Sequence, residues 1–82
     1  MTIYAGNLSK EITETDLRDA FKIFGTVTFV NIIQDRFHKT PIGFGMVGMP
    51  VQVEAQAAIA GLNGKEMKGK SLIVNEAGIR SL

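Results

Sequence analysis

The sequence predicts an α+β fold in which two helices cover one face of a four-stranded antiparallel sheet. Two patterns lead to this prediction. Apolar residues alternate with other residues in four segments, and they recur at helical spacing in two segments between them. The segments follow one another as strand, helix, strand, strand, helix, strand. Right-handed crossovers between the strands then bring both helices to the same face of the sheet.

The first strand and the first helix occupy the N-terminal third of the chain. The strand is predicted at residues 2–6, an alternating segment that ends at a Gly-Asn pair suited to a turn. The helix has Thr13 as its predicted N-cap and Gly25 as the C′ residue that ends it. Its apolar residues recur at i, i+3, i+4 and i+7, namely Leu17, Ala20, Phe21 and Phe24.

The rest of the chain supplies three strands and one helix. Residues 27–34 are rich in β-branched side chains and form the second predicted strand. A polar loop that ends in proline leads to the third strand, at residues 42–49, where the alternation resumes. Pro50 is predicted at the start of the second helix, and residues 71–75 form the last strand. The apolar residues of this second helix are Ala55, Ala58, Ile59 and Leu62.

This order of elements is that of the split βαβ, or ferredoxin-like, sandwich. One face of the sheet packs against the helices and forms the core, while the opposite face is open to solvent. We call this second surface the outer face of the sheet. The residues predicted on the sheet side of the core are Ile3, Ala5, Val30, Ile32, Val47, Met49, Leu72 and Val74.

Length and composition predict a single domain that spans residues 1–82. Apolar residues make up 45% of the chain, which suits a folded core, and the absence of cysteine excludes disulfides and thiolate metal sites. One histidine and no cysteine provide neither a nucleophilic triad nor a metal cluster, so we expect no enzyme and no cofactor. No segment has the pattern of a membrane span or a signal peptide, and we expect a cytoplasmic protein.

The predicted outer face is more apolar than a surface that meets water usually is. If the first and third strands are neighbours, the rings of Tyr4 and Phe44 lie side by side and point outward. A flat ring can stack on any nucleobase, so this pair is a candidate surface for single-stranded nucleic acid. The apolar residues predicted on this face are Tyr4, Ile33, Ile42, Phe44, Met46 and Ile73.

Over nearly its whole length the sequence resembles the RNA-recognition-motif (RRM) family, and in particular the small single-domain bacterial members. The family's first-strand hexamer appears as IYAGNL at residues 3–8, with Tyr4 at the position whose ring stacks on a base. Its third-strand octamer appears as IGFGMVGM at residues 42–49, where Phe44 supplies an aromatic ring. Two such motifs on predicted strands are a specific signal, whereas GFG alone is weak. The resemblance implies binding of single-stranded RNA.

Three octamer positions depart from the family pattern. Ile42 replaces the basic residue that the family places against a phosphate, and Met46 replaces the second stacking ring. Met49 replaces a third aromatic residue, but its side chain is predicted to face the core. Together with a net charge of +1, these departures predict binding that is weaker than the family's norm and only mildly dependent on salt.

The resemblance and the sheet pattern together define the candidate RNA-binding residues. Tyr4 and Phe44 are predicted to stack on bases, and Met46 to pack beside them. Basic residues of the hairpin loop and the C-terminal tail, and Lys10 after the first strand, are predicted to approach the phosphate backbone. The segment that begins at Asn75 resembles one that hydrogen-bonds to base edges in the family. The complete predicted set is Tyr4, Asn31, Arg36, Lys39, Ile42, Phe44, Met46, Asn75, Ala77 and Arg80.

A protein-interaction module with the same fold is the competing interpretation. Its outer face would bind a partner or a second copy, because interfaces also combine Tyr, Phe, Met and Ile side chains. We expect a monomer that binds single-stranded RNA, with a dimer through the outer face as the alternative. Stacking does not involve the sugar, so single-stranded DNA is a further candidate ligand. A lysine cluster before the last strand, at Lys65, Lys68 and Lys70, is predicted to be a solvated turn.

Overall fold

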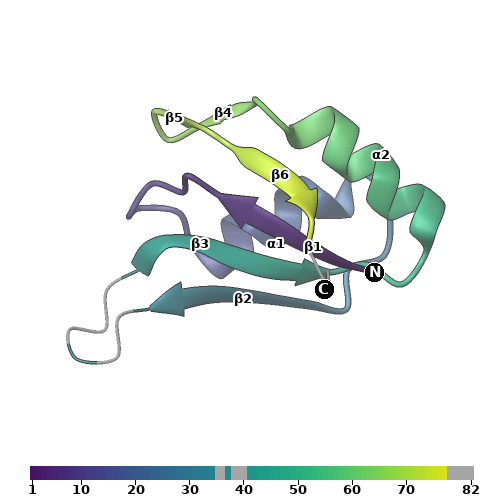
Figure 1. Cartoon of the computed structure of the whole chain (residues 1–82), viewed down its shortest axis with the longest axis horizontal. Helices are drawn as coiled ribbons and strands as arrows, with labels where there is room; N and C mark the ends of the chain where they lie inside the picture. The colour runs from purple at the N-terminus through teal and green to yellow at the C-terminus, as the bar shows by residue number, and fades with distance from the viewer. Residues whose placement is uncertain (35–36, 38–40, 78–82) are drawn as a thin grey trace, which may run out of the picture.

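The computed structural model describes residues 1–34, 37 and 41–77, and it confirms the predicted order of strands and helices. The elements are β1 (Thr2–Gly6), α1 (Glu14–Lys22), β2 (Phe29–Gln34), β3 (Pro41–Gly48), α2 (Gln52–Leu62), β4 (Glu66–Met67), β5 (Lys70–Ser71) and β6 (Ile73–Glu76). Four of the strands form an antiparallel sheet in the order β2-β3-β1-β6, with both helices on one face (Figure 1). β4 and β5 pair separately as a short hairpin.

The core lies between this sheet and the two helices. Ile3 in β1 lies opposite Val47 in β3, which in turn lies opposite Val30 in β2, so these side chains share the helix-facing side of the sheet. Every residue predicted on the sheet side of the core is buried. The helices contribute the buried residues Leu17, Phe21, Ala55, Ala58 and Leu62.

α1 begins at Thr13, the predicted N-cap, in a capping box. The hydroxyl of Thr13 accepts a hydrogen bond from the N–H of Asp16 at 3.1 Å, and the Asp16 carboxylate accepts one from the N–H of Thr13 at 3.0 Å. This backbone hydrogen bond, more than the nearby Lys68 ammonium, lowers the pKa of Asp16. Lys68 Nζ lies 3.5 Å from the Asp16 carboxylate, which links the β4–β5 turn to the first turn of α1.

The end of α1 differs from the prediction. The N–H groups of Phe24 and Gly25 donate to the carbonyls of Phe21 and Lys22, three residues earlier, in a tightened last turn. The helix therefore ends at Lys22 with Ile23 as its cap. The predicted C′ position of Gly25 is wrong by one residue, because Gly25 lies two residues beyond the cap.

The start of the last strand also differs from the prediction. Leu72 donates its N–H to the Lys65 carbonyl and accepts the N–H of Gly64, both at 2.8 Å, so its backbone pairs with the turn after α2. Pairing with β1 begins only at Ile73, which lies opposite Gly6. The lysine-rich segment predicted as a solvated turn is the β4–β5 hairpin, and its lysines are exposed.

The other elements lie within two residues of their predicted bounds. β2 begins at Phe29, two residues late, and the carbonyl of Val27, which precedes it, accepts a hydrogen bond from Arg18 Nη1 at 3.5 Å. α2 begins at Gln52, so Pro50 precedes the helix. Among the described residues, neither helix has the length and apolar character that crossing a membrane requires.

Candidate nucleic-acid interface

The outer face of the sheet, which the helices leave uncovered, carries three rows of side chains across the strands (Figure 1). Strand register defines these rows, because residues directly opposite each other point to the same face. We name them the Phe44 row, the middle row and the Phe29 row. Read from β6 towards β2, the Phe44 row consists of Ile73, Gly6 and Phe44. The middle row consists of Asn75, Tyr4, Met46 and Asn31. The Phe29 row consists of Thr2, Gly48 and Phe29.

Tyr4 and Phe44 meet diagonally between the Phe44 row and the middle row. Their ring centroids are 5.8 Å apart and the ring planes differ by 29°. Tyr4 lies opposite Met46, whereas Phe44 lies opposite Gly6. The Tyr4 ring covers Gly6: a Cβ atom placed there would lie 2.6 Å from Cε2 and 2.7 Å from Cζ of the ring. The two rings therefore form a continuous aromatic surface because Gly6 has no side chain.

The backbone at the ends of β1 and β3 fixes the position of this pair. Gly43 has φ +100°, which favours glycine, and it immediately precedes Phe44. Its carbonyl accepts the N–H of Leu8 at 2.9 Å, so the segment after β1 is held to β3 beside the ring. Asn7 makes the turn after β1 at φ 58°, and its side-chain amide donates to the Ser71 carbonyl at 2.7 Å.

Two side-chain amides, Asn31 and Asn75, lie at the ends of the middle row, on the two edge strands. Both residues are exposed, and within the part of the chain that the structure describes neither amide group has a hydrogen-bond partner. Each amide can donate and accept, which suits the edge of a nucleobase. Met46 lies between Tyr4 and Asn31 and is half-buried.

The three rows carry no charged residue. The cations that the structure describes lie elsewhere. Lys10 lines a hollow of about 440 Å³ together with Glu14 and the core residue Ile32, on the helix side of β2. The described surface that faces outward from the sheet is therefore neutral, apolar and bounded by amides.

Several predicted site residues lie outside this description. Arg36, Lys39 and Arg80 are not among the described residues, and for Ile42 only the backbone in β3 is described. Ala77 follows β6, and its N–H donates to the Thr2 carbonyl at 2.8 Å. This N–H is therefore already used within the protein.

Sequence reasoning missed Phe29 as a site residue. The residue is 43% exposed and lies on the outer face, at the start of β2 and opposite Gly48. The available signal was its spacing from Asn31, because residues two apart on a strand point to the same face of the sheet. Because the RRM motifs lie on the first and third strands, they direct attention away from this position.

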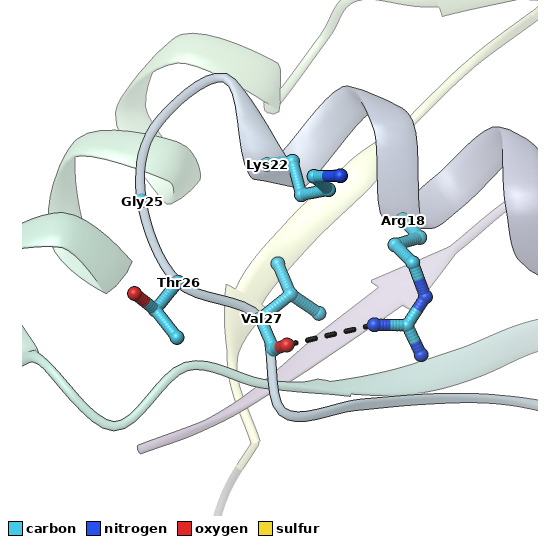
Figure 2. A pocket seen from close by; sticks show the side chains of 5 residues that line it. All are labelled: Arg18, Lys22, Gly25, Thr26 and Val27. Atoms are coloured by element: carbon cyan, nitrogen blue, oxygen red, sulfur yellow. Dashed lines mark hydrogen bonds between the residues drawn. The ribbon is translucent and has the colours of Figure 1, made fainter.

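A second hollow, of about 440 Å³, lies between α1 and the loop that leads to β2. Figure 2 shows Arg18 directed towards the carbonyl of Val27, with Lys22 on the next turn of the helix. The N–H of Thr26, which also lines this hollow, donates to the Glu54 carboxylate at 3.0 Å. The carboxylate of Glu54 thus contacts the backbone at the edge of this basic hollow, which is separate from the three rows.

Comparisons with known proteins identify the family of this chain. The RNA recognition motif family matches residues 3–73. RbpA of Nostoc sp. is 46% identical over 77 residues, which are 94% of this chain and 76% of that protein. Glycine-rich RNA-binding protein 1 of Mycosarcoma maydis is 41% identical over 78 residues. These residues make up 95% of this chain and 45% of that protein. The crystal structure of RNA binding protein PG1 superposes with a TM-score of 0.92 at 39% identity, covering 100% of this chain and 99% of that one. The chain belongs to the RNA recognition motif family, with its ferredoxin-like βαββαβ topology.

Proposed function

We propose that this protein binds single-stranded RNA on the outer face of its sheet, with bases stacked on Tyr4 and Phe44. The observation that carries the proposal is the pair of outward rings with centroids 5.8 Å apart, on a sheet face that the helices leave uncovered. Membership of the RRM family and the RNA-binding names of two of its relatives support it. Base stacking on such rings does not depend on base identity, so the rings supply affinity more than specificity.

The other predicted residues have distinct roles in this proposal. Met46 packs against a base beside the rings, and the amides of Asn31 and Asn75 hydrogen-bond to base edges at either side of the middle row. Ile42 adds an apolar contact with the RNA. Ala77 can offer only its carbonyl, because its N–H donates to Thr2. The remaining residues, Arg36, Lys39 and Arg80, position the phosphate backbone.

This neutral surface predicts weak dependence of RNA affinity on salt. For a single strand, the logarithm of the binding constant falls with the logarithm of the salt concentration, with a slope of about −0.7 for each phosphate that the protein neutralises. If Arg36, Lys39 and Arg80 are the cations in contact, the slope is no steeper than about −2. Measuring the dissociation constant at several salt concentrations tests this value. A much steeper slope would place additional lysines in the interface. It would contradict binding to the neutral outer face of the sheet.

An NMR titration of isotope-labelled protein with randomised short single-stranded RNA tests the proposal itself. We expect amide shifts concentrated at Tyr4, Phe44, Met46, Asn31 and Asn75, with α1 and α2 unchanged. A parallel titration with single-stranded DNA shows whether the sugar contributes. If these amides stay unchanged at high RNA concentration while linewidths report a dimer, the outer face is a protein interface and the proposal fails.

Gly6→Ala tests how the rings are held. The added methyl group would collide with the Tyr4 ring, so the ring has to leave its place beside Phe44. We expect RNA affinity to fall, by at most the 1 to 3 kcal/mol or so that one stacked base contributes. Gly61→Ala is the matched control, because its Cβ would lie 2.5 Å from Cζ of Phe24 on the helix side. Equal affinities of the two variants would show that the position of the Tyr4 ring does not matter for binding.

A further inference from the structure

We propose that Phe29 forms an additional base-binding subsite, which takes a nucleobase of the same RNA strand beyond the Tyr4–Phe44 pair. The inference rests on the proposed function and extends it to a third ring. Phe29 begins β2, an edge strand, and Tyr4 belongs to a central strand of the same sheet. The platform would therefore extend across the sheet to its β2 edge rather than end at Met46.

Strand register places Phe29 on the outer face. Phe29 lies opposite Gly48, and Asn31, two residues further along β2, lies opposite Met46. Val30, between them, is in the core. The Phe29 row and the middle row are therefore neighbours, about 6.8 Å apart along the strands at 3.4 Å per residue.

Phe29 and Tyr4 are each accommodated above a glycine. The Phe29 ring occupies the space above Gly48, where a Cβ atom would collide with ring atoms Cδ2 and Cε2. In the same way, the Tyr4 ring occupies the space above Gly6. With 43% of the residue exposed, Phe29 retains aromatic surface that a base can cover. Both ends of the outer face thus offer a ring above a glycine.

The backbone beside Phe29 is well anchored, which makes the ring a fixed target for a base. The N–H and the hydroxyl of Thr28 both donate to the Gly48 carbonyl, at 2.8 and 3.2 Å. Thr2, the remaining member of the Phe29 row, is small, so no bulky side chain in the row stands over the ring. A fixed ring loses little conformational entropy when a base stacks on it.

The Phe29 row lies about 13 to 14 Å along the strands from the Phe44 row, which is two row spacings. A base on Phe29 therefore cannot be the direct neighbour of a base on Phe44. At least one nucleotide has to pass over Met46 and Asn31 in the middle row. The subsite should consequently be invisible to the shortest oligonucleotides and contribute only to longer ones.

The test is the dependence of affinity on RNA length, measured with oligouridylates from a dinucleotide to an octanucleotide. Phe29→Ala should bind the dinucleotide as the unaltered protein does, and should bind the octanucleotide about 5- to 150-fold more weakly. Val53→Ala is the control, because Val53 is a 75% exposed apolar residue on α2, away from the outer face. It should leave affinity unchanged at every length.

Phe29→Trp provides a direct signal, because the chain contains no other tryptophan. The indole should keep the affinity for the octanucleotide, and its fluorescence should respond to the octanucleotide but not to the dinucleotide. This variant retains an aromatic ring above Gly48, so it decides the question even if Phe29→Ala unfolds.

A ring above a glycine also stabilises a sheet without any ligand. If Phe29→Ala matches the unaltered protein at every RNA length and the indole of Phe29→Trp does not respond, Phe29 has only that structural role. The proposed function then still stands on the binding of the unaltered protein. If the unaltered protein binds neither oligouridylates of any length nor the randomised RNA, both proposals fail.

Discussion

Alanine at both Tyr4 and Phe44 should remove most of the affinity for single-stranded RNA. Each ring that loses its stacked base should cost about 1 to 3 kcal/mol. The two losses should not add, because the rings are in contact, with centroids 5.8 Å apart, and each holds the other in place. A double-mutant cycle, with affinities from fluorescence titration of a labelled oligonucleotide, measures both the losses and their coupling.

Tyr4→Phe is the matched control for this pair, because it keeps the ring and removes only the hydroxyl. It should retain nearly all of the affinity. Loss of the rings also removes a contact within the sheet, worth roughly 0.2 to 1 kcal/mol of stability, so thermal unfolding of each variant should be followed in parallel. A folded double variant that binds RNA as well as the unaltered protein would exclude stacking on these rings.

The fold could be predicted from the sequence because its core side chains follow the two periods of strands and helices. Ile3 and Ala5 in β1, and Leu17 and Phe21 in α1, are buried in the predicted places. Thr13 could be identified as the N-cap because a hydroxyl three residues before an acid suits a capping box. These are local signals, and each is strong within a few residues.

The β4–β5 hairpin could not be predicted in the same way. Its strands have two residues each, Glu66–Met67 and Lys70–Ser71, which is too short for any alternation to be visible. The hairpin also contacts distant partners: Lys68 reaches Asp16 in α1, and the Ser71 carbonyl accepts the amide of Asn7. Such contacts follow from the tertiary structure and leave no pattern in the segment itself.

In the candidate site, too, residues marked by local sequence signals could be predicted, whereas a residue that depends on a distant partner could not. Tyr4 and Phe44 were found because a motif marks each of them and the strand order makes them neighbours. Phe29 was missed because its significance depends on Gly48, which stands opposite it on another strand. Only the register reveals that pair. A glycine on the outer side of one strand that faces an aromatic residue on the next is a signal that a sequence carries once the register is known.

Glycines on the outer face explain how an apolar sheet surface with few large side chains can still present flat rings. Gly6 and Gly48 carry no side chain, and a neighbouring aromatic ring occupies the space above each of them. A Cβ at either position would displace the ring. The two glycines thus act on the site through the rings that they accommodate, and neither has to contact RNA itself.

Phe21→Ala should have the largest effect on stability, and it separates the fold from the site. Phe21 is fully buried between the sheet and the helices. Its truncation should cost about 3 to 5 kcal/mol, because it removes apolar contacts and leaves a cavity. A chain of 82 residues has a free energy of unfolding of roughly 4 to 12 kcal/mol, so the variant should be marginally folded. Thermal or urea unfolding followed by circular dichroism measures the loss.

RNA should partly restore the stability of Phe21→Ala, because this substitution leaves the outer face intact. A ligand present at 100 times its dissociation constant adds about 2.7 kcal/mol to the stability of a protein that binds it only when folded. The double alanine variant at Tyr4 and Phe44 should show the reverse behaviour, folding without RNA and gaining little from it. If RNA raises the unfolding midpoint of both variants equally, the RNA is bound elsewhere than on the two rings. A rise confined to Phe21→Ala instead assigns binding to the outer face, because the core and the rings lie on opposite sides of the same sheet.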